Sequence, residues 1–353
     1  MINTVYQLVA PRRFEIKYSD IDLNNNKVIV RPTYLSICNA DQRYYQGLRD
    51  AEILRKKLPM ALIHEAIGEV VRDPSGNFKT GELVVMVPNT PVEEDDIIAE
   101  NTPTEHDDII AENYLRSSKF RASGFDGFMQ EYVEITPDRL VRLPQDIDRT
   151  VAAFTEIVSV SVHAIGRFDK IAHKRRNVIG IWGDGNLGYI TAVFFKTMFP
   201  ETKLYIFGVN PDKLQDFTFA DATFTVEHIP EDVKIDHAFE CVGGAGSGKA
   251  INQIIDYINP EGTISILGVS EYPVPINTRM VLEKGLRIFG SSRSGVADFE
   301  KTVALYKSNP EIINYLSNIV GAVVPVRTIE DMKKAFEMDI QKAFGKTIMM
   351  WDK

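Results

Sequence analysis

A glycine-rich turn between an apolar run and a helical pattern is the feature that most constrains how this chain can fold. The six residues of the turn are Gly183, Asp184, Gly185, Asn186, Leu187 and Gly188. In this G-x-G-x-x-G spacing the first glycine permits a tight turn, the second lets a pyrophosphate approach the backbone, and the third lets helix and strand pack closely. The free N–H groups of the following helix attract a phosphate. The turn therefore predicts a dinucleotide-binding site that includes these glycines with Asn186 and Leu187.

Strand and helix patterns alternate with short connections from about residue 176 onward. Strands are expected at 177–183, 203–208, 237–243, 263–268 and 286–292, with helices at 189–199 and around Ile251, Ile254, Ile255 and Ile258. The "GGAGSG" segment at 243–248 is expected to be a connecting loop. Such alternation is typical of a doubly wound parallel sheet. We therefore expect an α/β protein in which residues 151–295 form a Rossmann domain.

The first 150 residues contain short β-runs rather than this alternation. The runs lie at 27–32, 66–71, 82–88 and 127–135, between glycines, prolines and aspartates. They predict a mostly β domain at residues 1–150. The segment 296–353, which ends in a strand pattern, is expected to return and complete that domain.

The cofactor preference is read from the end of the second Rossmann strand. An NAD site normally carries a carboxylate about 20 residues past the loop, where it binds the ribose 2′-hydroxyl. Gly208 occupies that position here, so no charge repels a 2′-phosphate. Lys213, one helical turn on, is close enough in sequence to reach such a phosphate, although a solvated surface lysine remains the alternative. The sequence favours NADP(H).

The net charge of −9 comes from one segment. "NTPVEEDDIIAE" at 89–100 is followed by "NTPTEHDDIIAE" at 101–112, and together they hold nine acids and no Lys or Arg. The rest of the chain is therefore neutral, and no basic stripe indicates nucleic-acid binding. Each copy has a helix-start pattern, with Thr90 or Thr102 as the N-cap and proline next. We expect the second copy to dock and the first to extend as an added loop.

Other compositional features limit the class of protein. No apolar run approaches the roughly 18 residues of a membrane helix, and the N-terminus lacks a secretory pattern, so a cytoplasmic protein is expected. The chain has two cysteines, Cys38 and Cys241, which exclude a disulfide framework and a four-cysteine zinc module within one chain.

Four side chains are candidate metal ligands: Cys38, His64, Glu65 and Glu156. A thiolate, an imidazole and carboxylates suit a catalytic zinc, which keeps one position for water or substrate. Their spacing is not a compact motif. Taken singly, a buried cysteine, a core histidine and surface glutamates remain the alternatives.

A resemblance joins these residues. "IC-x-x-D", "HE-x-x-G-x-V", "GFMQEY" and the glycine turn occur in the order found in the zinc-dependent medium-chain alcohol and polyol dehydrogenases, which the chain resembles over nearly its full length. The resemblance implies a GroES-like catalytic domain at 1–150. It also implies Cys38 and His64 as zinc ligands, Glu65 and Glu156 at or near the metal, and Asp41 as the acceptor of the His64 ring N–H.

Longer segments narrow the resemblance. "CNADQRYYQGLRD", "DHAFECVGG" and "LEKGLRIFGSSRSG" are similar to the ribulose-5-phosphate reductases (ribitol-5-phosphate dehydrogenases). This implies zinc- and NADPH-dependent reduction of D-ribulose 5-phosphate to D-ribitol 5-phosphate, the precursor of CDP-ribitol for cell-wall teichoic acid. A ribitol-5-phosphate cytidylyltransferase is then a possible partner, and a homodimer is expected. An NAD-dependent polyol dehydrogenase acting on an unphosphorylated sugar alcohol is the alternative.

The chain differs from many of these dehydrogenases at two places, and its substrate needs a phosphate-binding site. Ala40 replaces the serine or threonine that commonly begins the proton relay, so the relay must run through water, a zinc-bound carboxylate such as Glu65 or Glu156, or a substrate hydroxyl. One catalytic zinc and no structural zinc are expected, because the family's four-cysteine lobe has no cysteines here. The substrate phosphate needs cations and hydroxyls, for which the candidates are Arg43, Tyr44 and Arg293.

Overall fold

The computed structural model describes residues 1–90, 111–115, 118–342 and 344–353. These residues form two compact units. The first combines Met1–Ile157 with Arg293–Lys353, and the second is Val158–Ser292.

The second unit is built on a six-stranded parallel sheet. Its strands are β11 (Val178–Trp182), β12 (Lys203–Gly208), β13 (Ala222–Thr225), β14 (Ile235–Glu240), β15 (Ile258–Ile266) and β16 (Arg287–Gly290). They are ordered β13-β12-β11-β14-β15-β16, so the order reverses beside β11, where a doubly wound sheet binds its ligand. The expected Rossmann topology is confirmed.

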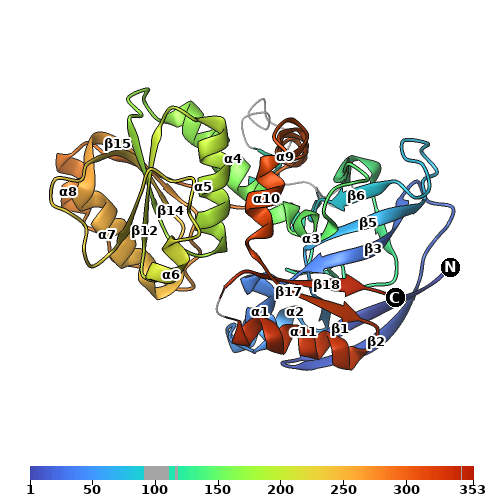
Figure 1. The fold of residues 1–353 in the computed structure, drawn as a ribbon. Coiled ribbons are helices and arrows are strands. Elements are labelled where there is room, and N and C mark those ends of the chain that lie inside the picture. Colours follow the sequence, from blue (N-terminus) through green and yellow to red (C-terminus); the bar gives the residue numbers. More distant parts are fainter. Residues whose placement is uncertain (91–110, 116–117, 343) are drawn as a thin grey trace, which may run out of the picture. The chain divides into compact units, whose positions relative to one another are not determined.

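Helices cover both faces of this sheet. They are α4 (Thr155–Ile171), α5 (Asn186–Met198), α6 (Pro211–Leu214), α7 (Ser247–Tyr257) and α8 (Thr278–Glu283). Helix α5 lies on one side of the sheet and α7 on the other (Figure 1). The apolar face of α7, with Ile251, Ile254 and Ile255, is buried against the sheet, as its spacing predicted, but Ile258 is wrongly placed on the helix because it begins β15. The expected loop at 243–248 is only partly a loop, because α7 already begins at Ser247.

The first unit contains a seven-stranded sheet completed by strands from the C-terminal segment. Its strands are β3 (Val28–Ser36), β5 (Glu65–Arg72), β6 (Leu83–Met86), β9 (Val133–Ile135), β10 (Leu140–Arg142), β17 (Val320–Val326) and β18 (Lys346–Trp351). Strand β18 pairs antiparallel with β3, with Ile348 opposite Ser36 (Figure 1). The C-terminal segment therefore returns to the first unit, as expected.

Smaller elements surround that sheet. They are β1 (Ile2–Ala10), β2 (Arg13–Asp20), β4 (Met60–Ala61), β7 (Asn89–Thr90), β8 (Lys119–Phe120), α1 (Asn39–Tyr45), α2 (Ala51–Lys57), α3 (Arg149–Ala152), α9 (Val296–Ser308), α10 (Glu311–Ser317) and α11 (Ile329–Gln341). The sequence did not predict the β1–β2 hairpin or helices α1 and α2. The strand expected at 127–135 is wrong for its first six residues, which instead hydrogen-bond to residues 4 and 61–63. No helix in the described ranges is long and apolar enough to cross a membrane.

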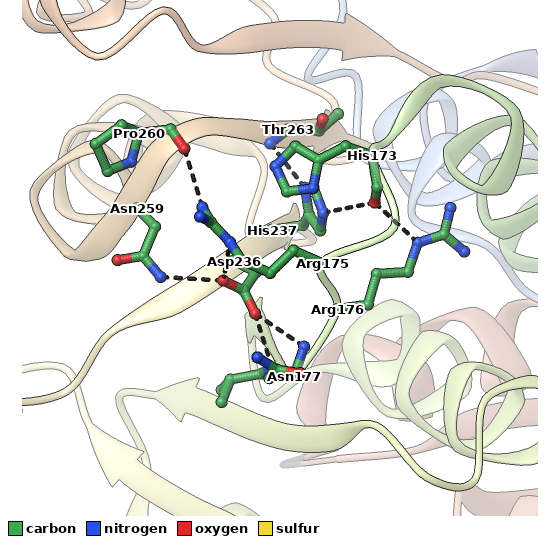
Figure 2. Close-up of polar contacts among 10 residues, drawn as sticks. His173, Arg175, Arg176, Asn177, Asp236, His237, Asn259, Pro260 and Thr263 are labelled. Carbon is green, nitrogen blue, oxygen red and sulfur yellow. Dashed lines mark hydrogen bonds and ion pairs between the residues drawn. The ribbon is translucent and has the colours of Figure 1, made fainter.

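The buried carboxylate of Asp236 connects the N-terminal ends of β11, β14 and β15 (Figure 2). Asp236 accepts hydrogen bonds from the backbone N–H groups of Asn177 and Val178 at 2.8 and 3.2 Å, from Arg175 Nε at 2.9 Å and from Asn259 Nδ2 at 3.0 Å. It lies at the ends of the strands opposite the glycine turn. Its partners satisfy a buried charge, so its role is structural.

The neighbouring His237 is fully buried and has a fixed tautomer. Its Nδ1 accepts the Thr263 N–H at 3.0 Å, and its Nε2 donates to the His173 carbonyl oxygen at 3.2 Å. Burial, followed by the nearby His173, lowers the pKa of His237 to about 4. Protonation would break the bond from Thr263.

This pKa predicts loss of stability in mild acid. The unfolded chain takes up a proton at His237 near pH 6.5, whereas the folded chain does so only near pH 4. As the pH falls from 7.5 to 5, the free energy of unfolding should therefore drop by on the order of 1 to 2 kcal/mol more than in His237→Asn. Urea titrations of both proteins at each pH test this. Equal pH dependence would contradict the prediction.

Only the two ends of the duplicated segment, residues 89–90 and 111–112, are among the described residues. Asn89 and Thr90 of the first copy form β7, which pairs with β8. Glu112 of the second copy accepts the Val296 N–H at 2.9 Å at the start of α9 and binds Arg139 at 2.9 Å. The helix starts expected after Thr90 and Thr102 lie outside the described residues, but Thr90 itself ends a strand.

Deletion of residues 89–100 should therefore keep both attachments. Because each copy begins with Asn-Thr-Pro, the deletion restores Asn-Thr after Pro88 and leaves Glu112 in place. We expect a change of less than about 0.5 kcal/mol in the free energy of unfolding and near-unchanged activity, as for a shortened surface loop. The control is Glu112→Ala, which removes the α9 contact and should destabilise by about 1 kcal/mol. A larger loss from the deletion would mean that the extra copy is integral.

Candidate functional site

Cys38 lies where β3 ends and α1 begins. The Cys38 N–H donates to Asp41 Oδ2 at 3.1 Å, so the side chain of the third helical residue caps the start of the helix. The other oxygen of Asp41 accepts the Ile63 N–H at 2.9 Å. One buried carboxylate thus connects the segment of Cys38 to the residue before His64.

A strained turn presents His64. Ile63 has φ of +71°, which is unusual for a β-branched residue and marks stored strain. Gly127 and Phe128 donate their N–H groups to the carbonyl oxygens of Ala61 and Ile63 at 2.8 and 2.7 Å. A Cβ on Gly127 would lie 2.4 Å from the Ile63 carbonyl oxygen. The "GFM" part of the "GFMQEY" motif therefore holds this turn in shape.

The two segments bring three metal-binding side chains together. Ligand atoms of Cys38, His64 and Glu65 all lie within 4.8 Å of one another. Thiolate sulfur, imidazole nitrogen and carboxylate oxygen form a donor set that fits zinc with an open position. The donor set therefore fits the group expected at this site.

A buried lysine that the sequence analysis missed belongs to this cluster. Lys346, at the start of β18, places its Nζ 2.9 and 2.8 Å from the two carboxylate oxygens of Glu65. Burial opposes the charge of Lys346, but Glu65 outweighs it and raises the pKa of the lysine above its usual value. Only pairing along β18 could have revealed it, because the two residues are 281 positions apart.

Glu156, at the start of α4, is also buried beside this cluster. Burial raises the pKa of its carboxyl group to about 7, with His64 opposing the shift and Glu65 adding to it. The three-residue cluster above does not include Glu156. It is therefore a neighbour of the donors, and its role as a ligand stays a prediction.

The predicted contact between Asp41 and the His64 ring is looser than a hydrogen bond. His64 Nδ1 lies 3.7 Å from Asp41 Oδ1. Burial lowers the pKa of His64, but Asp41 and Cys38 outweigh it and hold that pKa well above the usual value. Asp41 is thus an electrostatic partner of the ring, and its hydrogen bonds go to the backbone.

The candidate phosphate-binding residues occupy different environments. The Arg293 guanidinium lies 5.0 Å from the centre of the Phe120 ring, and that ring lies 5.3 Å from the His64 ring. Arg43 is half-buried on α1. Tyr44 is in the core and only 1% exposed, where its ring packs against Arg49, so it is a poor candidate for contacting a phosphate.

The glycine turn has the geometry expected of each glycine. Gly183 has φ of +127°. Nothing lies within 4 Å of a Cβ built on Gly185, which leaves the backbone open to a pyrophosphate, whereas a Cβ on Gly188 would lie 1.9 Å from the Gly183 carbonyl oxygen. Asn186 and Leu187 begin α5, whose free N–H groups face this turn.

A cavity adjoins the turn at the end of β12. Its lining includes Gly183, Gly185 and Gly208, together with Val209 and Lys249. Lys213 does not line this cavity. Lys249 was not among the predicted residues, because it lies 41 positions beyond Gly208 in the sequence.

Comparisons with known proteins consistently place the chain among the zinc-dependent dehydrogenases. The family model of the alcohol dehydrogenase GroES-like domain matches residues 24–145, and that of the zinc-binding dehydrogenases matches residues 207–308. Ribulose-5-phosphate reductase of Bacillus spizizenii is 55% identical over 352 residues, covering 100% of both chains. Ribulose-5-phosphate reductase 2 of Staphylococcus aureus is 56% identical, covering 99% of both chains.

A solved structure is similar over the whole length. The S. aureus TarJ structure in complex with NADPH matches with a TM-score of 0.87 and 50% sequence identity, covering 100% of both chains. The similarity includes both units and extends to a structure whose cofactor is known.

Proposed function

Because the chain belongs to the zinc-binding dehydrogenases and, within them, to the ribulose-5-phosphate reductases, we propose that it reduces D-ribulose 5-phosphate to D-ribitol 5-phosphate with NADPH. The observation that carries the proposal is the Cys38, His64 and Glu65 cluster in a chain so similar to these enzymes. The ribitol phosphate would serve as the precursor of CDP-ribitol for teichoic acid.

Cys38, His64 and Glu65 would hold the metal, with Glu156 as a further carboxylate beside them. A bound zinc ion supplies Lewis-acid polarisation of a carbonyl oxygen, and NADPH supplies the hydride. The segment 127–129 fixes His64 through the strained turn, and Asp41 fixes both donor segments. Lys346 balances the Glu65 charge, so the buried cluster is not left with excess negative charge.

A proton must reach the alkoxide oxygen that forms from the ketone. Ala40 offers no hydroxyl, and both oxygens of Glu65 contact Lys346. We therefore assign the proton transfer to the Glu156 carboxyl group rather than to Glu65. Water would return the proton to Glu156 after each turnover.

One experiment separates this function from an NAD-dependent polyol dehydrogenase. Zinc content is measured, and the oxidation of NADPH and NADH is followed with ribulose 5-phosphate and with ribulose. We expect activity with NADPH and ribulose 5-phosphate. With ribulose, kcat/KM should be at least about a hundred-fold lower, because the charge-assisted hydrogen bonds between the protein and the substrate phosphate are lost. Preference for NADH and unphosphorylated ribulose would support the alternative instead.

We further propose that Arg293 binds the substrate phosphate. Phe120 contacts both the His64 ring and the Arg293 guanidinium, which puts a positive charge near the metal donors, and a pentulose phosphate carries its phosphate only a few bonds from the ketone. Arg293→Met should raise KM for ribulose 5-phosphate about ten- to a hundred-fold and leave the slow rate with ribulose unchanged.

The matched control for Arg293 is Arg279→Met, since Arg279 pairs with Glu283 on the exposed surface of α8. Its KM should equal that of the unaltered protein. Equal losses with ribulose and ribulose 5-phosphate in Arg293→Met would contradict phosphate binding. A homodimer and contact with a cytidylyltransferase stay predictions.

A further inference from the structure

The carboxylate of Asp184 fills the space beside Gly208. Asp184 Oδ2 accepts the N–H groups of Val209 and Asn210 at 2.8 and 2.7 Å, which connects the glycine turn to the end of β12. A Cβ built on Gly208 would lie 2.7 Å from both Cβ and Oδ2 of Asp184. Real Cβ atoms do not approach other atoms so closely, so position 208 has no room for a side chain while Asp184 is in place.

This contact explains why position 208 has no carboxylate to bind the ribose of the cofactor. In an NAD site an Asp or Glu at this position accepts a hydrogen bond from the 2′-hydroxyl. Here the turn itself supplies a carboxylate that excludes such a residue. One oxygen of Asp184 is bound by two backbone donors, which reduces its repulsion of a nearby phosphate.

Lys249 supplies a positive charge to the same cavity. It lies on α7, lines the same cavity as Gly208 and Val209, and is exposed. Asp184 and Lys249 are the charged side chains among the described residues that line this cavity. Within the part of the chain that the structure describes, Lys249 has no ion-pair partner, so its ammonium group is available to a ligand.

We propose that Lys249 binds the 2′-phosphate of the cofactor, and that Asp184 is the positioning residue that keeps position 208 free of a competing acid. This rests on the proposed function, because it assumes that the cavity holds the adenosine end of NADPH. The cavity then selects NADPH in two ways. Lys249 attracts the 2′-phosphate, and the filled space beside Gly208 removes the group that would favour a 2′-hydroxyl.

Direct binding measurements test Lys249 without any substrate. Dissociation constants for NADPH and NADH are measured by nucleotide fluorescence for the unaltered protein, Lys249→Met, Lys249→Arg and Lys170→Met. Lys249→Met should weaken NADPH binding about ten- to a hundred-fold and leave NADH binding unchanged. Lys249→Arg should retain most of the preference. Lys170, an exposed lysine of α4 in the same unit, is the control and should leave both constants unchanged.

Two outcomes would overturn the role of Lys249. One is an equal loss for NADPH and NADH in Lys249→Met. The other is an NADPH-selective loss in Lys213→Met with none in Lys249→Met, which would transfer the role to Lys213.

Two variants at the end of β12 test Asp184. Gly208→Asp alone should weaken both cofactors, because the new side chain collides with Asp184. Gly208→Asp combined with Asp184→Gly should recover NADH binding to within about ten-fold of NADPH binding. If Gly208→Asp alone already binds NADH nearly as tightly as NADPH, Asp184 does not exclude a side chain at position 208. These constants do not depend on turnover, so a failure here is separate from failure to reduce ribulose 5-phosphate.

Discussion

Replacement of Cys38 by serine is expected to remove the bound zinc and lower kcat/KM for ribulose 5-phosphate by roughly a thousand-fold or more. The thiolate is the one sulfur donor of the cluster with His64 and Glu65, and a hydroxyl is a poor zinc ligand. Loss of Lewis-acid stabilisation worth several kcal/mol corresponds to a rate loss of this size. Zinc content by elemental analysis and initial rates with NADPH measure the two effects.

The Cys38→Ser protein should remain folded and bind NADPH as before, since the glycine turn belongs to the other unit. Cys241→Ser is the matched control for zinc content, because it removes the chain's other thiol and should retain the metal. If Cys38→Ser reduces ribulose 5-phosphate at the unaltered rate with no zinc present, a metal-assisted reaction is wrong.

Replacement of Lys346 by methionine should lower the free energy of unfolding by about 3 to 5 kcal/mol. Lys346 and Glu65 are 2% and 0% exposed, so the substitution leaves a buried carboxylate without its cation. The unbalanced charge should also change the metal affinity of the cluster. Urea denaturation and zinc titration of the metal-free protein measure these effects separately.

Two further proteins make the Lys346 result interpretable. Lys333→Met breaks an exposed pair with Glu330 and should cost at most about 0.5 kcal/mol. The double variant Lys346→Met/Glu65→Gln should regain much of the stability, because it no longer buries an unpaired charge. A Lys346→Met protein as stable as Lys333→Met would contradict the assigned role of the pair.

Elements whose structure is determined by neighbouring residues could be predicted from the sequence. The strand expected at 203–208 is β12, with the same first and last residues. The G-x-G-x-x-G spacing predicted a turn followed by a helix at 189–199, and the structure has both, although α5 begins three residues earlier, at Asn186. In each case the period of apolar residues and the glycine positions suffice, because strand, turn and helix start are local features.

Contacts between distant segments could not be predicted in this way. The run at 127–135 has a strand-like composition, yet Gly127, Phe128 and Met129 bond to the turn at 61–63, and only an isolated bridge joins Gln130 to Val5. Lys346 also looks like an ordinary strand residue until β18 pairs with β3. Cys38, His64 and Glu65 were found through a resemblance, since nothing in their spacing brings them together.

The pairing of β18 with β3 has a consequence for how the protein is made. Cys38, His64 and Glu65 leave the ribosome early, whereas Lys346 follows Glu65 by 281 positions. During synthesis the whole nucleotide-binding unit emerges, and can fold, while Glu65 still lacks its counter-ion. The metal-donor cluster can therefore be completed only after β18 has emerged, and a nascent chain stalled before β18 would have a folded nucleotide-binding unit and an unfinished catalytic one.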